Sequence, residues 1–385
     1  MNIGIVLYPT FGGSGIVATE LGKALASKGH KVHFITYNLP ARLSHLGENM
    51  FYHEVMVSNY PLFDYTPYEL VLTSKLVDVV EHEKLDLLHV HYAIPHASAA
   101  FNAREILKSK GIYIPFITTL HGTDITLVGK DPSFEPVITF SINQSDAVTS
   151  VSKDLKKDTY KHFNITREIE VIPNFICPQR HTAQSVNEQL RAYYAPNGER
   201  IIMHISNFRP VKRVTDVVEV FARILNKMPA KMLFVGDGPD RYAAEQLCRK
   251  LGTCKHTSFL GKVKDVEEIL ILADLFILPS ETESFGLSAL EAMISKVPVI
   301  STNTGGLPEV NENGKSGFIS NVGDVDDMSK NAIQILENDE TLNRFKEGAF
   351  QRALEFDIDK ILPLYEDLYS RTLASIKVEQ KLLCN

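Results

Sequence analysis

A chain of 385 residues is longer than one ordinary hydrophobic core needs, so its length predicts two domains. Apolar residues make up 44% of the chain and charged residues 23%, a globular balance that argues against a long disordered tail. The formal net charge of −7 argues against a nucleic-acid partner, and no apolar run approaches the roughly 18 residues of a membrane span. We therefore expect a folded, cytoplasmic protein with no stable membrane association.

Apolar runs that are typical of buried strands alternate with helical patterns from the start of the chain, which indicates βαβ units and parallel sheets. Amphipathic segments near residues 15–28 and 96–109 are predicted helices between some of these strands. The strands predicted in the first half are residues 3–9, 31–37, 87–92, 115–121 and 147–152. Together they predict one doubly wound sheet.

A second series of strands follows a stretch that contains Pro173 and Pro178 and has little periodicity, as expected of a connection between domains. Its members are residues 201–206, 231–238, 256–262, 275–280 and 298–302. After Gly323 the pattern is helical, and we expect the last stretch to return to the first domain. The predicted domains are residues 1–175, joined by a helix over 358–385, and residues 176–357.

A glycine-rich turn lies where the first predicted strand ends. Ligands of parallel α/β sheets bind outside the carboxyl ends of the strands, so functional residues are expected in such loops. Gly13 and Gly15 would let a ligand approach the backbone, and the N–H groups of the following helix would face a phosphate or carboxylate. A tight turn without a ligand is the alternative. No acidic residue ends the second strand at Thr36 to Asn38, which disfavours NAD.

Polar residues also follow the strand over 115–121. His121 and Asp124 could bind the hydroxyls of a sugar or orient a diphosphate, whereas a purely structural histidine is the alternative. Nearby, His89 and His91 alternate with apolar residues on a strand and have no evident third ligand, so they are predicted to line the core or a cleft rather than hold zinc.

Two loops of the second domain carry cations and glycine. The turn from Asn207 to Arg213 could neutralise a diphosphate, although a solvated basic turn is the alternative. Gly236, at the end of the next strand, could admit a nucleotide base or ribose to the backbone.

The stretch from Glu283 to Glu291 follows another strand and places two carboxylates eight positions apart. On one helix that spacing corresponds to about 12 Å, too far for the carboxylate pair of a glycoside hydrolase, which lies roughly 5 to 9.5 Å apart. Separate contacts with different parts of a donor fit better. Ordinary helix acids are the alternative.

These motifs together, ESFGLSALEA with the GGSG turn, HGTD and the cationic turn, resemble family 4 (GT4) of the retaining glycosyltransferases. The resemblance covers nearly the whole chain and implies an α/β protein of the GT-B fold, with two facing Rossmann-like, doubly wound domains and a cleft between them. More narrowly, PTFGGSGIVATELGKALASKGH, LLHVHYAIPHA, TTLHGTDIT and ISNFRPVKRVTDVV look like the members that make N-acetylglucosaminyl malate for bacillithiol biosynthesis. This implies UDP-N-acetylglucosamine as donor, L-malate as acceptor, retention at the anomeric carbon and release of UDP.

The resemblance also implies roles for individual residues. Its catalytic residues would be His121 near the sugar, Glu283 touching the sugar and Lys212 at the diphosphate. The acceptor-binding residues would be Ser14 at a carboxylate, Tyr92, Thr119 (with Thr118 as the alternative) and Arg209. The donor-binding residues would be Gly13, Gly15, Asp124, Arg209, Lys212, Gly236, Ser284, Phe285, Gly286, Leu287 and Glu291, the last at the ribose. Asn207 stands where the family usually has an arginine, so Arg209 could serve malate, the diphosphate or both.

No side chain is placed as an obvious nucleophile, so we expect front-face substitution in which the leaving phosphate oxygen takes the proton of the malate hydroxyl. Backbone N–H groups, Lys212 and Arg209 would stabilise the departing charge, and neither a metal nor a cofactor is expected. The DxD sequences at 324–326 and 357–359 precede helical segments and are predicted to be helix-start acids.

Two other functions stay open. One is a GT-B transferase with an inositol phosphate or lipid acceptor, although a basic amphipathic face is not strongly present. The other is a nucleotide-sugar-binding module without catalysis. Whether the chain forms a homo-oligomer is left open as well.

Overall fold

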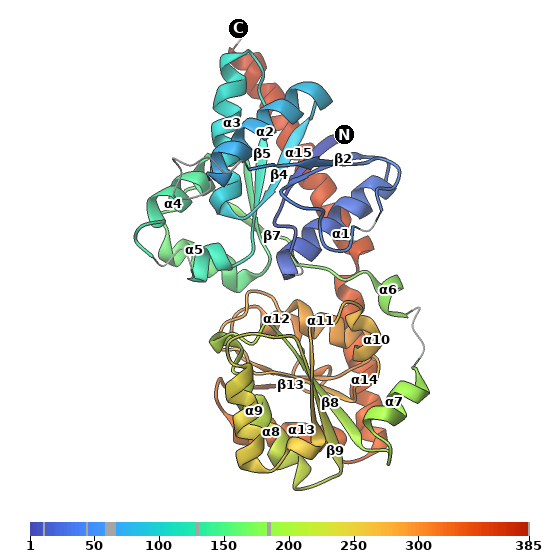
Figure 1. Cartoon of the computed structure of the whole chain (residues 1–385). Helices are drawn as coiled ribbons and strands as arrows, with labels where there is room; N and C mark the ends of the chain where they lie inside the picture. Colours follow the sequence, from blue (N-terminus) through green and yellow to red (C-terminus); the bar gives the residue numbers. More distant parts are fainter. Residues whose placement is uncertain (11, 44, 58–66, 128–130, 183–185, 384–385) are drawn as a thin grey trace. The chain divides into compact units, whose positions relative to one another are not determined.

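The computed structural model describes residues 1–10, 12–43, 45–57, 67–127, 131–182 and 186–383. The chain divides into two compact units (Figure 1). Unit 1 comprises residues 1–174 and 358–385, and unit 2 comprises residues 175–357. Among the described helices, none is both long enough and apolar enough to cross a membrane.

Unit 1 is built on a sheet of seven parallel strands in the order β3-β2-β1-β4-β5-β6-β7. The strands are β1 (Asn2–Val6), β2 (Lys31–Thr36), β3 (Met50–Glu54), β4 (Leu87–His91), β5 (Phe116–Leu120), β6 (Ala147–Ser150) and β7 (Ile169–Val171). The strand order changes direction between β1 and β4, and such a switch point is where doubly wound sheets bind ligands.

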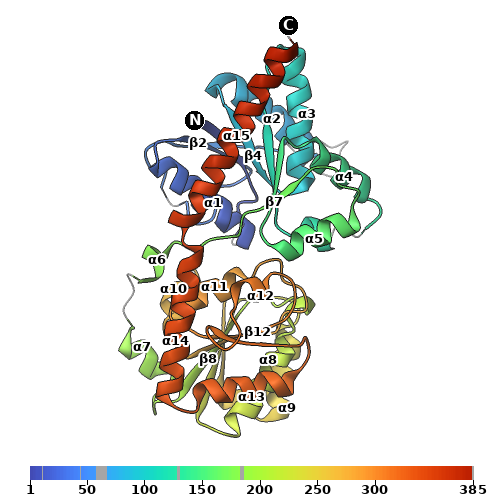
Figure 2. The ribbon, with the colours of Figure 1, turned by 180° about the vertical axis from the view of Figure 1, so that it is seen from behind.

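Helices cover both faces of this sheet (Figures 1 and 2). On one face, α2 (Tyr68–Glu83) and α3 (Ser98–Ser109) pack on an apolar cluster that includes Ile35 and Leu88. On the other face, α1 (Gly13–Ser27) packs so closely on Phe34 that a Cβ at Gly22 would lie 2.4 Å from its ring. The long helix α15 (Ile358–Leu383) lies on this second face and crosses the sheet in Figure 2. The remaining helices are α4 (Glu135–Gln144) and α5 (Lys153–His162), with short helical turns over Ala93–Ala97 and Thr123–Leu127.

Unit 2 is built on a sheet of six parallel strands in the order β10-β9-β8-β11-β12-β13. The strands are β8 (Arg200–Ile205), β9 (Ala230–Val235), β10 (Thr257–Gly261), β11 (Leu275–Leu278), β12 (Val299–Thr302) and β13 (Gly317–Ser320). The helices are α6 (Pro178–Thr182), α7 (Glu188–Tyr194), α8 (Val214–Leu225), α9 (Arg241–Leu251), α10 (Val266–Leu270), α11 (Leu287–Ile294), α12 (Leu307–Val310), α13 (Val325–Leu336) and α14 (Asp339–Ala353). Short 3-10 turns cover Pro210–Lys212, Cys254–His256 and Leu354–Phe356.

Apolar residues on one face of a helix form part of the core of unit 2. In α8, Val217, Phe221 and Ile224 recur at the spacing of one helix face and are buried with residues of α13 and of the sheet. At the start of α13, the Asp324 carboxylate accepts the N–H of Asp327, which confirms the prediction that this acid caps a helix.

Each predicted strand forms within a few residues of its expected bounds, and the prediction of two doubly wound parallel sheets is confirmed. The sequence did not predict β3, β7 and β13. Strand β3 is an edge strand of half-buried and exposed residues, and β7 has only three residues, so neither carries the apolar run of a buried strand. Strand β13 begins with Gly317, because a Cβ there would lie 1.8 Å from the Val299 carbonyl oxygen. Glycine is not typical of strands, so this start gave no strand signal.

Candidate active site

The glycine-rich turn of unit 1 brings the start of α1 to the carboxyl end of β1. A Cβ at Gly15 would lie 2.5 Å from the carbonyl oxygens of Tyr8 and Thr10, so only glycine fits this close approach. The cap residue Gly12 offers no side chain to the first N–H groups of α1, and the first turn of α1 holds no acidic residue. These N–H groups make the helix start a suitable place for an anion. Phe11, within this predicted motif, lies outside the described residues.

Ser14 and Tyr92, both predicted to bind the acceptor, are in contact. The Tyr92 hydroxyl donates to Ser14 Oγ over 2.7 Å and joins the turn after β4 to the start of α1. Tyr92 has φ of +89°, an unusual conformation for a residue with a side chain, and such strain is often kept at functional sites. Its ring also packs edge-on against Tyr8, with the ring centroids 5.3 Å apart.

His121 is held by a second histidine. His91 Nδ1 lies 2.8 Å from His121 Nε2, and the two rings are stacked with their centroids 5.1 Å apart. Burial lowers the pKa of His121 to about 3, so its imidazole is neutral near pH 7. His91 is thus a neighbour of the predicted site, and the alternation on its strand predicted a core or cleft position but not this contact.

Asp124 binds backbone groups within unit 1. Its carboxylate accepts the N–H of Ala93 over 2.8 Å and the N–H of Gly122 over 3.2 Å, and so ties together the turns that follow β4 and β5. Burial raises the pKa of Asp124 to about 6 in spite of these hydrogen bonds. The arrangement positions Tyr92 and His121, which flank the two turns.

Both candidate threonines on β5 are buried. Thr119 Oγ1 lies 2.7 Å from His89 Nε2 and 2.7 Å from Thr149 Oγ1, and Thr118 Oγ1 lies 2.7 Å from Ser145 Oγ. The hydroxyls of both residues therefore make internal contacts. Thr119 stays a prediction as an acceptor contact.

In unit 2, an internal hydrogen-bond chain fixes the loop after β8. His204 Nδ1 lies 2.8 Å from the Ile277 carbonyl oxygen, so this nitrogen carries the proton and Nε2 accepts from the Ser206 hydroxyl, also over 2.8 Å. Ser206 Oγ in turn accepts the N–H of Phe208 over 3.1 Å. Gly236, with φ of +112°, packs against this loop, because a Cβ there would lie 1.8 Å from the Ser206 carbonyl oxygen.

Lys212 and Glu283, both predicted to be catalytic, form an ion pair. Lys212 Nζ lies 2.5 Å from Glu283 Oε2, and the Ser280 hydroxyl donates to the same oxygen over 3.2 Å. Arg209, in the same loop as Lys212, is exposed and has no ion-pair partner among the residues that the structure describes. Among the described residues, Arg209 thus carries a positive charge that no ion pair uses.

The segment Glu283 to Leu287 leads into α11. Gly286 has φ of +99° at the start of the helix, while Phe285 is buried and packs on Phe356 with ring centroids 5.6 Å apart. Ser284 and Leu287 are partly buried, and Glu291 is buried on α11. Glu283 and Ser284 therefore lie between the carboxyl end of β11 and the start of α11, whereas Glu291 lies within the helix.

A second glycine turn, which the sequence motifs did not predict, supports this segment. A Cβ at Gly305 would lie 1.8 Å from the Glu283 carbonyl oxygen, and the Gly306 N–H donates to that oxygen over 2.9 Å. The signal was present in the sequence, because Thr304 to Gly306 follows β12 and precedes α12, as Gly13 to Gly15 follows β1.

Family profiles of glycosyltransferases match both halves of the chain. Residues 11–180 match the profile "Glycosyltransferase Family 4", and residues 186–352 match "Glycosyl transferases group 1". The chain is 45% identical over 378 residues to the N-acetyl-alpha-D-glucosaminyl L-malate synthase of Bacillus anthracis, covering 98% of each protein.

Solved structures share the fold at lower identity. The HepE protein of Anabaena, solved with UDP and glucose, superposes with a TM-score of 0.80 at 19% identity, covering 96% of this chain and 99% of that one. A sucrose-phosphate synthase of Thermosynechococcus elongatus has a TM-score of 0.78 at 19% identity, covering 97% of this chain and all of that one. These likenesses confirm the predicted glycosyltransferase fold, and the identity to the malate synthase shows that the chain belongs to the group 1, family 4 glycosyltransferases.

Proposed function

We propose that the protein transfers N-acetylglucosamine from UDP-N-acetylglucosamine to the hydroxyl of L-malate. The anomeric configuration is retained, UDP is released, and the product, N-acetyl-alpha-D-glucosaminyl L-malate, is the first intermediate of bacillithiol biosynthesis. The observation that carries this proposal is the 45% identity over 98% of the chain to a synthase of that name.

In this proposal unit 2 binds the donor. Lys212 neutralises the diphosphate. Glu283, whose carboxylate lies 2.5 Å from Lys212 Nζ, contacts the sugar. The N–H groups at the start of α11, at residues 286–287, bind oxygen atoms of the donor. Glu291 accepts hydroxyls of the ribose, and the bare backbone at Gly236 contacts the nucleoside.

Unit 1 binds most of the acceptor. Ser14, supported by the Tyr92 hydroxyl, donates to one carboxylate of malate, and the N–H groups at the start of α1 favour the same negative charge. Arg209 also binds a malate carboxylate in this proposal. A dicarboxylate suits these contacts, because they offer its negative charges hydrogen-bond donors and a cation.

His121 contributes a neutral imidazole that binds a hydroxyl of the transferred sugar. Its contact with His91 at 2.8 Å orients the ring, and burial keeps the ring uncharged. A neutral ring can hydrogen-bond a hydroxyl without placing a fixed positive charge beside the anomeric carbon, which gains positive charge in the transition state.

The reaction proceeds by front-face substitution. The bond from the anomeric carbon to the phosphate oxygen breaks, and the malate hydroxyl oxygen forms the new bond on the same face. The hydroxyl proton passes to the departing phosphate oxygen. Lys212 and the N–H groups of the helix starts stabilise the charge of UDP as it leaves, so the scheme needs neither a metal nor a cofactor.

UDP release from UDP-N-acetylglucosamine, measured with and without L-malate, tests the proposal. We expect release to depend on L-malate, and the product to show the α-anomeric signal by NMR. Succinate is the matched control, because it keeps both carboxylates and lacks the hydroxyl, so it should inhibit without being glycosylated. If UDP is released only with an inositol phosphate or a lipid, that compound and not malate is the acceptor. If the protein binds UDP without any turnover, it is a nucleotide-sugar-binding module.

A further inference from the structure

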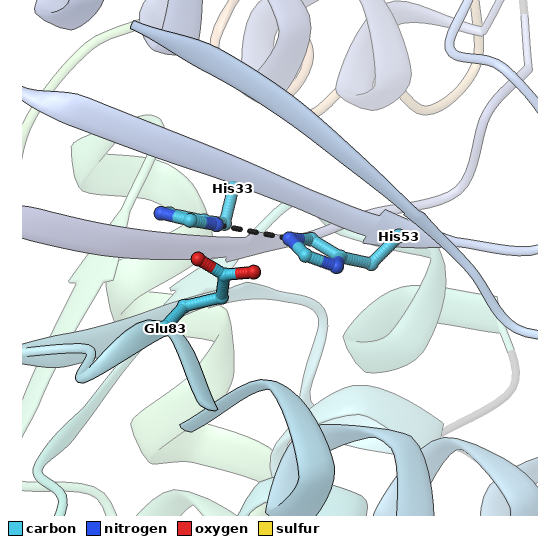
Figure 3. A group of neighbouring side chains, drawn as sticks. All are labelled: His33, His53 and Glu83. Carbon is cyan, nitrogen blue, oxygen red and sulfur yellow. Dashed lines mark hydrogen bonds between the residues drawn. The ribbon is translucent and has the colours of Figure 1, made fainter. Parts of the chain in front are cut away.

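Three potential metal ligands lie close together in unit 1, apart from the candidate active-site residues (Figure 3). His33 is on β2, His53 is on β3 and Glu83 is the last residue of α2. One ligand atom from each side chain can be chosen so that all of them lie within 4.8 Å of one another. The two imidazoles are already in contact, with 2.9 Å between His33 Nδ1 and His53 Nε2.

The strand register explains how these residues meet. His53 pairs with Ile35, and Ile35 is two positions from His33, so the two histidines point to the same face of the sheet. Ile35 packs in the apolar cluster under α2, which identifies this face as the one that α2 covers. The carboxyl end of α2 then brings Glu83 to the histidines, as Figure 3 shows.

We propose that His33, His53 and Glu83 bind one Zn²⁺ ion. Two imidazole nitrogens and one carboxylate oxygen form a ligand set that proteins use for zinc, at about 2.0 to 2.2 Å from the ion, with a fourth tetrahedral position left for water. Ligands at these distances are about 3.4 Å apart in a tetrahedral site, so the two nitrogens need to separate by only about half an ångström.

The charges around the site are mixed. The charges of Lys31 and Glu83 act on His33, and those of Lys75, Asp78 and Glu83 act on His53. Burial lowers the pKa of His33 to about 4 and also lowers the pKa of His53. A metal would need the lone pairs of both facing nitrogens, so the proton of the hydrogen bond between the rings would move to the other nitrogen of its own ring.

The ion would stabilise structure and take no part in the transfer. Asn2 Nδ2 donates to the carbonyl oxygens of Glu83 and Lys84, which puts the end of α2 at the amino end of β1. Ser14, Tyr92 and His121 follow the carboxyl ends of strands. Zinc would instead connect the edge strand β3, its neighbour β2 and the end of α2. This inference does not rest on the proposed function.

The test is zinc binding by the full chain without a histidine tag, measured by isothermal titration calorimetry and by competition with a chelating dye. We expect one Zn²⁺ per chain and a higher melting temperature with zinc, because a ligand of the native state stabilises it. Loss of an outer contact to a metal ligand weakens binding by about 10- to 100-fold, so His53→Ala and Glu83→Gln should each weaken it at least that much.

His82→Ala is the matched control, because His82 is an exposed histidine on α2 whose Nδ1 contacts the carbonyl oxygen and the carboxylate of Asp78 rather than a proposed ligand. Its affinity for zinc should equal that of the wild type. Glu83 is exposed, so Glu83→Gln keeps the test valid if His53→Ala does not fold. Equal zinc affinity in the wild type, His53→Ala and Glu83→Gln would overturn the proposal.

EDTA separates a structural ion from a catalytic one. It should lower the melting temperature of the zinc-loaded protein and leave malate-dependent UDP release unchanged at a temperature where the protein stays folded. A loss of UDP release that only Zn²⁺ restores, in the wild type and not in Glu83→Gln, would overturn the structural role.

Discussion

Lys212 Nζ and Glu283 Oε2 lie 2.5 Å apart and join the loop after β8 to the loop after β11. Both side chains are largely buried, with relative exposures of 19% and 17%, so water screens this pair less than it screens a surface pair. Glu283 fixes the position of the lysine. If Lys212 binds the donor diphosphate, as proposed, this defined geometry lowers the ordering entropy that binding must overcome.

Lys212→Ala should lower kcat/KM for UDP-N-acetylglucosamine by about ten- to two-hundred-fold, because a hydrogen bond to a charged group contributes roughly 1.5 to 3 kcal/mol. The variant also leaves the Glu283 carboxylate without its cation. Lys227→Ala, at an exposed lysine, is the control and should retain wild-type kinetics. Wild-type donor kinetics in a folded Lys212→Ala variant would remove Lys212 from the diphosphate site.

Tyr92→Phe removes the hydroxyl that donates to Ser14 over 2.7 Å and keeps the ring that packs on Tyr8. A neutral hydrogen bond contributes about 0.5 to 1.5 kcal/mol, so the KM for L-malate should rise by about two- to tenfold. The dissociation constant of UDP, measured by calorimetry, should not change. A variant that loses UDP affinity and keeps its malate KM would move Tyr92 from the acceptor to the donor.

Glu291→Gln tests the proposed ribose contact with little change in volume on a buried helix. A carboxylate can accept both ribose hydroxyls, whereas an amide has only one accepting atom. The dissociation constant of UDP should therefore rise by about tenfold or more. The same substitution should weaken the binding of 2′-deoxy-UDP less, since that ligand lacks one of the two ribose hydroxyls. Equal losses for the two nucleotides would place Glu291 away from the 2′-hydroxyl.

Stability should fall as the pH falls below 6.5. Burial lowers the pKa of His89 and of His121 from 6.5 to about 3, and it lowers that of His96 to about 4. Between these values and pH 6.5 the unfolded chain binds protons that the native state excludes, so the free energy of unfolding decreases with falling pH by up to about 1.4 kcal/mol per pH unit for each histidine. Well above pH 6.5 the unfolded chain has also lost these protons, so the three histidines contribute no slope there.

Asp124 acts in the opposite direction over a narrower range. Its pKa is raised from 3.8 to about 6, so between these values the native state binds a proton that the unfolded chain does not. The free energy of unfolding therefore gains from Asp124 as the pH falls from 6 to 4. The histidines outnumber it, and the net effect should be acid destabilisation. Melting curves followed by circular dichroism from pH 7.5 to 4.5 measure the slope, and His89→Gln should reduce it. A melting temperature that stays level over this range would contradict the protonation states derived from burial.

Sequence patterns predicted the buried parts of this fold and the loops that carry its candidate site. Runs such as residues 201–206 are apolar because both faces of a parallel strand are covered. Edge strand β3 has no such run, and its histidine approaches His33 only through a pairing register that the sequence does not state. The contact between His91 and His121 likewise depends on the alignment of β4 with β5.

Arg209 provides the sharpest test of the acceptor. It is exposed, it lies in the loop that His204 and Ser206 fix, and it has no ion-pair partner among the described residues. If it binds a malate carboxylate, Arg209→Ala should lower kcat/KM for malate by about ten- to two-hundred-fold, since the lost bond is charge-assisted. UDP affinity should change much less.

Arg209→Lys distinguishes charge from geometry. An ammonium keeps the positive charge but cannot form the paired hydrogen bonds of a guanidinium with a carboxylate, so this variant should recover only part of the loss. Steady-state kinetics with malate varied, together with calorimetry of UDP, give both quantities for each variant. If Arg209→Ala binds UDP poorly while its malate KM keeps the wild-type value, Arg209 serves the diphosphate. The acceptor carboxylate would then depend on Ser14 and the start of α1, where the N–H groups lack a side-chain cap.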